Sequence, residues 1–211
     1  MSREAGARWA LLACASACLG LFVWLAMTIS SGAVGSFDEA VRSGIHRFSS
    51  ADLTRLARGV SLLGSGAVIA SLSVIAFIGF YATGRRRAAI ALAVVMAGAV
   101  VLENALKFAL HRARPEPFFG TAPETYSFPS GHALFSACFY AALAWLLSAA
   151  FRNLGARAVI WVISLALIAA IGLSRLYLGV HYPTDVIAGY LVAAFWITGL
   201  LASPASRNAD C

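Results

Sequence analysis

Six apolar runs constrain what this chain can fold into more than any other feature of its sequence. A helix needs about 20 mostly apolar residues to cross the hydrocarbon core of a bilayer. Apolar side chains make up 61% of the 211 residues and charged ones only 12%, whereas about a quarter of the residues in soluble domains are charged. The runs cover about residues 9–29, 62–83, 88–110, 132–150, 158–176 and 184–202. The sequence therefore predicts an all-α protein, a polytopic membrane bundle of six transmembrane helices that forms a single domain over residues 1–211.

The first apolar run resembles a secretory signal, because the charged opening REAGAR precedes it. Its apolar stretch continues from Trp9 to Ile29, and this exceeds the roughly 7 to 15 apolar residues of a signal peptide. We therefore expect the run to be retained as a membrane anchor.

The segment 30–61, between the first two runs, is too polar to cross a membrane. Within it, Val41, Ile45 and Phe48 recur at helical spacing beside polar neighbours. This pattern predicts a short helix that lies at the membrane interface. Such a helix could be a plain surface cover or a lid over a site, and the sequence leaves both alternatives open.

The positions of the basic residues predict the orientation in the membrane. Lys and Arg are equally frequent on the two predicted sides, but the two shortest connections, GRRR (84–87) and FRNLGAR (151–157), are both rich in arginine. Short Arg-rich loops favour the cytoplasmic side, so we expect both chain ends, including Arg207, in the cytoplasm. The net charge of +7 then reflects topology, and no nucleic-acid partner is expected because basic residues do not alternate with aromatic ones.

The cysteines give no sign of a metal site or of a disulfide framework. Their spacing lacks the pairs that such sites require; they are Cys14, Cys18, Cys138 and Cys211. The polar clusters described next contain no group of carboxylates that could hold a pair of metal ions. We therefore expect neither a metal nor a cofactor.

The first of three polar clusters ends the third apolar run with the sequence KFALHRARP. Lys107 and Arg114 lie seven residues apart, so they share a helix face if the helix continues through ALHRA. Lys107 is the only lysine in the chain, which favours a site that needs a compact ammonium group. The alternative is a pair of cations that extend from a helix end towards the interface.

The second cluster is the sequence PSGH, from Pro129 to His132, at the mouth of the fourth run. Pro129 ends the preceding loop, Ser130 is a natural N-cap, and Gly131 lets a ligand approach the backbone. The free N–H groups at such a helix start attract anions, above all phosphate. A plain cap with an interfacial histidine is an equally good interpretation of these four residues alone.

The third cluster, SRLYLGVHYPTD, connects the last two runs. His181 and Asp185 lie four residues apart around Pro183, a favoured first residue of a helix. A carboxylate that accepts one imidazole N–H fixes the tautomer and leaves the other nitrogen free to attack or to exchange protons. Arg175 adds a planar donor that suits phosphoryl oxygens. A structural His–Asp bond that closes a turn is the alternative.

With the expected orientation, all three clusters face the outer side, and ionisable groups near membrane depth usually mark function. Together they supply cations, two histidines and a helix N-terminus, which indicates an anionic ligand and metal-free phosphoryl transfer. The sequence here resembles the type-2 phosphatidic acid phosphatase superfamily, lipid phosphatases related to vanadium haloperoxidases. The signature of that family, K-x6-RP, PSGH and SR-x5-H-x3-D, is intact and in order over residues 107–185, where Ser174 opens the last part.

The resemblance implies a role for each signature residue. His181 would be the nucleophile that forms a phosphohistidine, Asp185 would orient it, and His132 would be the general acid and then the base. The phosphoryl oxygens would be held by Lys107, Arg114, Arg175 and the Ser130–Gly131 backbone. A phospholipid transporter or flippase without hydrolysis is the alternative from another class, but transport does not require an oriented nucleophile. A haloperoxidase shares the motifs but would be a soluble protein.

The expected partners are the bilayer and a membrane lipid phosphate, cleaved at the outer face of a bacterial cytoplasmic (inner) membrane. The short loop PEPFFGTAPETYSF offers aromatic side chains as interfacial anchors, namely Phe118, Phe119, Tyr126 and Phe128. A loop this short favours a small headgroup. From the resemblance we expect undecaprenyl diphosphate, cleaved to the monophosphate, ahead of phosphatidylglycerol phosphate, phosphatidic acid or lipid A.

Overall fold

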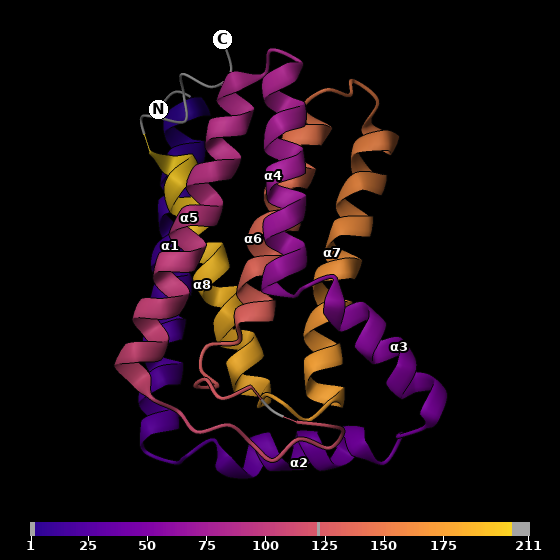
Figure 1. Cartoon of the computed structure of the whole chain (residues 1–211). Helices are drawn as coiled ribbons and strands as arrows, with labels where there is room; N and C mark the ends of the chain where they lie inside the picture. Colours follow the sequence, from indigo (N-terminus) through magenta and orange to yellow (C-terminus); the bar gives the residue numbers. More distant parts are fainter. Residues whose placement is uncertain (1–2, 122, 204–211) are drawn as a thin grey trace.

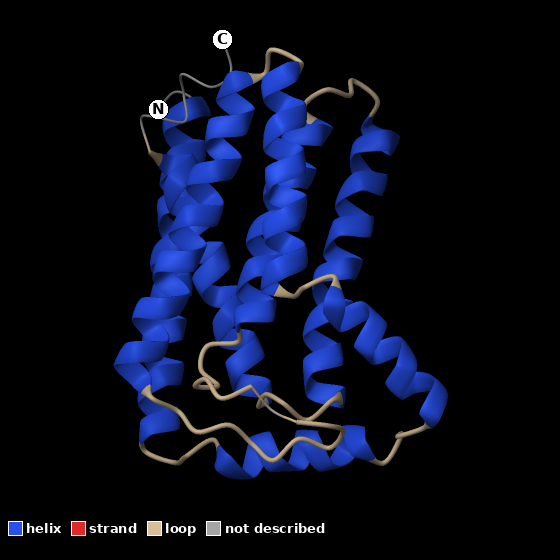
Figure 2. Ribbon diagram, viewed as in Figure 1, coloured by secondary structure: helices blue, strands red, loops and turns tan. Residues whose placement is uncertain are grey.

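The computed structural model describes residues 3–121 and 123–203, with backbone only for Arg3 and Glu4. Helices are the only regular structure in this part of the chain, as Figure 2 shows, and no strand occurs among these residues. The prediction of an all-α bundle is therefore confirmed. The helices are α1 (Arg3–Ser30), α2 (Gly35–His46), α3 (Ala51–Leu62), α4 (Gly66–Ala82), α5 (Arg86–Leu110), α6 (Gly131–Ser148), α7 (Leu154–Tyr177) and α8 (Pro183–Ala202).

Most of the predicted membrane spans correspond to single helices. Five helices are long and apolar enough to cross a bilayer alone: α1, α5, α6, α7 and α8. The second predicted span, 62–83, corresponds to the shorter α4, which passes the same test only together with α3 across a bend of 45°. The described residues thus contain five spans, or six when α3 and α4 count as one broken span.

The bend between α3 and α4 follows from local sequence. Ser65 accepts a hydrogen bond from the N–H of Val68 and so caps the start of α4. Just before it, Gly64 lies against α7, where an added Cβ atom would be only 2.4 Å from Cγ2 of the fully buried Ile171. Glycine at this position therefore lets the break pack directly on the bundle.

Segment 30–61 forms two helices, whereas the sequence predicted one short interfacial helix. The helix that carries Val41 and Ile45 is α2, and it ends at His46, so that Phe48 lies in the turn beyond it and is 77% exposed. Ser50 then caps α3 by accepting from the N–H of Leu53. In Figure 1, α2 runs across one end of the bundle and α3 climbs from there towards α4.

Helix α6 forms the centre of the bundle and is the most buried of the spans. It packs against α4, α5, α7 and α8, and α1 packs along α8. Large apolar side chains on the outside of the bundle remain exposed, as expected for surfaces that face lipid; on α1 they include Trp9, Trp24 and Met27.

The connections separate into two ends of the bundle (Figure 1). The beginning of α1, the end of α8 and the short connections α4–α5 and α6–α7 lie at one end. At the other end lie α2, the loop 111–130 and the α7–α8 connection, and the three polar clusters lie in these two connections and in the adjoining ends of α5, α6, α7 and α8. The fold thus gathers the predicted site residues at the end away from the Arg-rich connections.

This arrangement predicts that Glu124 and Arg152 lie on opposite sides of the membrane. In a variant whose native cysteines are replaced by serine, a membrane-impermeant thiol reagent should label Glu124→Cys and Arg152→Cys from opposite faces of sealed vesicles. Labelling of both from the same face would contradict the arrangement. Two positions also suited to such mapping, Ala122 and Arg207, lie outside the described residues.

Candidate active site

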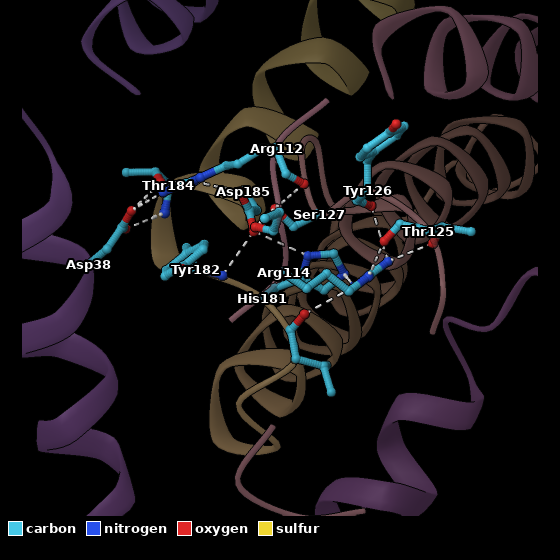
Figure 3. A network of polar contacts seen from close by, with 12 residues as sticks. Asp38, Arg112, Arg114, Thr125, Tyr126, Ser127, His181, Tyr182, Thr184 and Asp185 are labelled. Atoms are coloured by element: carbon cyan, nitrogen blue, oxygen red, sulfur yellow. Dashed lines mark hydrogen bonds and ion pairs between the residues drawn. The ribbon is translucent and has the colours of Figure 1, made fainter. Parts of the chain in front are cut away.

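The segments that carry the three polar clusters meet at the lower end of the bundle in Figure 1, and Figure 3 shows the contacts of Arg114, His181 and Asp185 from close by. Lys107 lies in the last turn of α5, and Arg114 lies in the loop that follows. Ser130 precedes α6, which begins with Gly131 and His132. Arg175 belongs to the last turn of α7, and His181 and Asp185 lie at the start of α8.

His181 and Asp185 form a buried pair at the start of α8. Pro183 is the first residue of this helix, as the sequence predicted, and Asp185 lies in its first turn. Oδ2 of Asp185 lies 3.3 Å from Nδ1 of His181 and accepts a hydrogen bond of 2.9 Å from the N–H of Tyr182. His181 is 1% exposed and Asp185 is fully buried, so the orientation of the imidazole is fixed by its surroundings.

Arg114 reaches the site by a route that the sequence did not predict. Helix α5 stops at Leu110, where His111 adopts a left-handed conformation with φ 44°, so the helix does not continue through ALHRA and the condition for Lys107 and Arg114 to share a helix face is not met. Arg114 instead extends from the loop and donates to the carbonyl oxygens of Thr125 at 2.6 Å and Val180 at 3.0 Å. Its Nη1 lies 3.0 Å from Nε2 of His181.

These contacts determine the tautomer of His181. A guanidinium group can only donate hydrogen bonds, so Nε2 of His181 accepts from Arg114 and carries no proton. The ring proton then resides on Nδ1, where Asp185 accepts it. The lone pair of Nε2 is therefore directed towards the cationic residues of the site.

The charges of the site are shaped by burial. Burial lowers the pKa of His181 to about 4, because the charged imidazolium would lose its water, and the nearby Arg114 and Arg175 add to this effect while Asp185 opposes it. His181 is thus neutral at physiological pH. Burial likewise lowers the pKa of Arg114, against the opposing influence of Asp185 and Glu103.

The PSGH sequence begins a helix as predicted, since α6 starts at Gly131 and Ser130 is its N-cap residue. The N–H of Ser130 donates to the carbonyl oxygen of Asp185 at 3.0 Å, which ties the starts of α6 and α8 together. The Ser130 side chain does not cap the helix: its Oγ atom is buried and has no hydrogen-bond partner among the described residues. Buried polar atoms are rarely left unpaired, so this hydroxyl is suited to bind a ligand.

Arg175 and Lys107 border the same space. Arg175 is 8% exposed, and its Nη1 donates to the hydroxyl of Ser61 on α3. Its Nε atom is buried without a hydrogen-bond partner in the part of the chain that the structure describes. Lys107 forms an ion pair with Glu103 one turn earlier on α5, and a Cβ atom at Gly131 would lie 2.8 Å from Oε1 of that glutamate. The Lys107 ammonium group is therefore held beside the start of α6.

His132, the second residue of α6, is half-buried at the edge of this group. The positive charges of Arg175, Arg114 and Lys107 and the His181 ring all act on it electrostatically. It also lies beside the α3–α4 break, where an added Cβ atom at Gly64 would be 3.5 Å from its Cδ2. The structure thus brings together all eight residues that the sequence predicted for the site.

Sequence reasoning missed several residues that support these eight. Arg112 bonds to Asp185 at 2.6 Å and to Asp38 at 2.7 Å, and Ser61 bonds to Arg175. A second arginine within RAR was a visible signal for Arg112. Asp38 and Ser61 have no motif around them, and only the fold brings them to the site.

The aromatic residues of the loop 115–128 differ in their surroundings. The prediction that Phe128 anchors the loop at the interface is wrong, because this side chain is 1% exposed and stacks on Phe22 of α1. Phe118 stacks on His46 and Phe119 on Tyr177, so both are half-buried in contacts within the protein. Among the four predicted anchors, Tyr126 is the exposed one, at 42%.

The donor set of the site is mostly cationic. Lys107, Arg114 and Arg175 are accompanied by the carboxylates of Glu103 and Asp185, each of which is engaged in an ion pair. Among residues 3–121 and 123–203, no group of three or more His, Cys, Asp and Glu side chains is placed to hold a metal ion. Chemically, such a site can bind a phosphoryl group and present the Nε2 lone pair of His181 to it.

Comparisons with known proteins agree with this chemistry. The family model described as the PAP2 superfamily matches residues 88–209. Phosphatidylglycerophosphatase B of Bacillus subtilis is 29% identical over 170 residues, which are 80% of this chain and 84% of that protein. A lipid A 1-phosphatase of Rhizobium johnstonii is 38% identical over 48% of this chain and 41% of its own length. An undecaprenyl-diphosphatase of Sulfolobus acidocaldarius is 32% identical over 54% of both chains.

A solved structure shares the fold. The crystal structure of a transmembrane PAP2-type phosphatidylglycerolphosphate phosphatase from Bacillus subtilis matches with a TM-score of 0.82 at 27% sequence identity. The match covers 92% of this chain and 96% of that one. It therefore extends well beyond the signature at residues 107–185.

Proposed function

Because this chain belongs to the PAP2 superfamily, we propose that it is a membrane lipid phosphatase that works through a phosphohistidine intermediate. The observation that carries the proposal is the placement of His181. Its Nδ1 proton is held by Asp185, and its Nε2 lone pair is directed at Arg114 among the cationic side chains. A lipid transporter would need the cations but not this oriented, neutral imidazole.

In the proposed first step, Nε2 of His181 attacks phosphorus while the bond from phosphorus to the lipid oxygen breaks. Arg114 turns from Nε2 to a phosphoryl oxygen, and Lys107, Arg175 and the Ser130–Gly131 helix start bind the others. Asp185 stabilises the positive charge that the ring gains. His132, in its protonated form, gives its proton to the departing lipid oxygen.

In the second step, His132 is neutral and takes a proton from a water molecule. The oxygen of that water attacks the phosphorus of the phosphohistidine, and the P–N bond breaks. Phosphate leaves, His181 regains its lone pair, and His132 is again protonated for the next cycle.

The substrate that we propose first is phosphatidylglycerol phosphate. The signature residues act on the phosphoryl group alone, so substrate choice should depend on the segments outside them. The phosphatidylglycerophosphatase B of Bacillus subtilis is similar over 80% of this chain, whereas the undecaprenyl-diphosphatase of Sulfolobus acidocaldarius is similar over 54%. Undecaprenyl diphosphate, which the sequence alone favoured, is the second candidate, and both have the small headgroup that a short loop favours.

We further propose that residues 1–211 form one domain in a bacterial cytoplasmic membrane, with both termini inside and the site outside. The Arg-rich connections at the end of the bundle away from the site support this orientation. In the thiol-labelling experiment above, Glu124→Cys should then react in intact cells and Arg152→Cys only after the membrane is opened. The reverse result would place the site on the cytoplasmic face.

The two histidines should affect turnover more than binding. We expect His181→Ala to abolish phosphate release and His132→Ala to reduce kcat by about 10²–10⁴-fold, as loss of general acid–base catalysis does. Phosphate release by purified protein in detergent measures the turnover of both variants. The control is His111→Asn, which changes an exposed histidine at the left-handed end of α5, where asparagine is tolerated. Turnover of His181→Ala at the wild-type rate would refute the nucleophile assignment.

We also propose that catalysis needs no metal ion, because Lys107, Arg114 and Arg175 supply the positive charge that the transferring phosphoryl group requires. Phosphate release should therefore be unchanged after dialysis against EDTA, whereas vanadate, which can adopt the five-coordinate geometry of the transferring group, should inhibit. Activity that is lost in EDTA and restored by Mg²⁺ or Zn²⁺ would overturn this proposal.

A direct comparison of kcat/KM tests the substrate. The panel contains phosphatidylglycerol phosphate, undecaprenyl diphosphate, phosphatidic acid, lipid A and a soluble phosphate ester. We expect the first lipid to have the highest value and the soluble ester to be a poor substrate, since the site lies at headgroup depth. A higher kcat/KM for undecaprenyl diphosphate would make it the preferred substrate and leave the proposed chemistry intact.

A further inference from the structure

Arg112 joins the carboxylate that holds the nucleophile to a carboxylate from a distant part of the chain. Its Nη1 donates to Oδ1 of Asp185 at 2.6 Å, and its Nη2 donates to Oδ2 of Asp38 at 2.7 Å (Figure 3). Both carboxylates are fully buried. One guanidinium group therefore bridges α8, which carries Asp185, and α2, which carries Asp38.

Asp38 also accepts hydrogen bonds directly from the start of α8. Its Oδ1 accepts from the N–H of Thr184 at 3.1 Å, and its Oδ2 accepts from the Thr184 hydroxyl at 2.7 Å. That hydroxyl in turn accepts from Nη1 of Arg112 at 2.8 Å. The three side chains form a closed set of hydrogen bonds around the first turn of α8, next to His181.

The second carboxylate has an electrostatic consequence for the first. Arg112 alone would largely neutralise Asp185 and so weaken its hold on the His181 ring. Asp38 shares the guanidinium group, so the side chains of Asp38, Asp185 and Arg112 together carry one net negative charge. These side chains are buried, where charges are poorly screened. Asp185 can then keep its Oδ2 available for His181 and the N–H of Tyr182 while Arg112 occupies its Oδ1.

A second tie connects α2 to the same region. Arg42, one turn after Asp38 on α2, donates to the carbonyl oxygen of Glu116 at 2.8 Å. Its guanidinium group lies 5.4 Å from the ring centre of Tyr182, and that of Arg112 lies 4.1 Å from the same ring. Tyr182, the neighbour of His181, is therefore in contact with cations from α2 and from the loop after α5.

We propose that Asp38 and Arg112 are positioning residues for the nucleophile, and that α2 is a fixed support of the active site. Through Asp185 they hold the His181 ring and favour the positive charge that this ring gains as the P–N bond forms. The inference rests on the proposed phosphohistidine mechanism. It also assigns a role to the α2 segment, for which the sequence alone left open a cover or a lid.

The proposal predicts a loss of kcat without a loss of substrate binding, because the imidazole gains charge only as the reaction proceeds. Asp38→Asn keeps the shape of the side chain and removes its charge. We expect kcat to fall about 10- to 100-fold, the loss seen when the hydrogen-bond partners of metal-bound histidines are removed, while KM stays within about twofold. Inhibition by vanadate, which mimics the transferring group, should weaken in parallel with kcat.

Two further variants make the test specific. Asp52→Asn is the matched control, because it removes the same charge from an exposed residue of α3, whose ion pair is with Arg55 three residues later; it should behave as wild type. Arg112→Lys keeps the charge but loses the fork that reaches both carboxylates, so it should reproduce the loss of kcat at unchanged KM. Size-exclusion elution and Tm in detergent establish that each variant is folded.

The outcomes separate this inference from the proposed function. A folded Asp38→Asn or Arg112→Lys enzyme with wild-type kcat would overturn the inference, and so would a loss confined to KM. If neither variant folds, the bridge is purely structural and the positioning role is likewise overturned. Failure of the proposed function would instead show in the wild-type protein, as no release of phosphate from any lipid, or as full activity of His181→Ala.

Discussion

The burial of the Asp185 carboxylate constrains the end of the bundle that carries the candidate active site. Asp185 is fully buried, and an ionised carboxylate away from water is costly unless its oxygens are hydrogen-bonded and its charge is paired. The partners of its side chain come from two segments: His181 and Tyr182 precede α8, and Arg112 lies in the loop after α5. The N–H of Ser130 at the start of α6 is bonded to its backbone carbonyl. The hydrogen bonds of this one residue therefore tie the loop after α5 and the start of α6 to the start of α8.

The same constraint explains why a cationic site can exist beside a bilayer. Arg114 and Arg175 would be costly to bury alone, but carbonyl oxygens, the Ser61 hydroxyl and the His181 ring take up part of their donor capacity. Within the described part of the chain, the buried side-chain atoms without a hydrogen-bond partner are Nε of Arg175, Oγ of Ser130 and Nε of Arg42, and the first two belong to the predicted phosphate-binding residues. An incoming phosphoryl group would thus complete a hydrogen-bonding set that the protein alone leaves unfinished.

Sequence predicted the parts of this structure that depend on local pattern. Long apolar runs gave the membrane helices, and short motifs gave Lys107, the PSGH helix start and the His181–Asp185 pair. The third apolar run ends where α5 ends, at Leu110, but no glycine or proline in the sequence indicates that His111 adopts a left-handed conformation there and directs Arg114 into a loop. Asp38 and Thr184 are 146 positions apart, and no local pattern could have paired them. The sequence predicts Phe128 as a membrane anchor because aromatic rings are common at bilayer interfaces. The same ring can also pack in a protein core, and in the structure it stacks on Phe22.

The distinction between a lid and a support for α2 can be argued from what opening would cost. Swinging α2 away from the bundle would separate Asp38 from Arg112 and from the first turn of α8, and would pull Arg42 away from Glu116. Breaking a buried ion pair costs about 3–5 kcal/mol when a charge is left without its partner. Opening would also loosen the hold of Asp185 on His181 at the moment when substrate arrives. Opening of α2 as a lid would therefore disturb the contacts that position His181. On the proposed mechanism, substrate must reach His181 while α2 stays packed against the bundle.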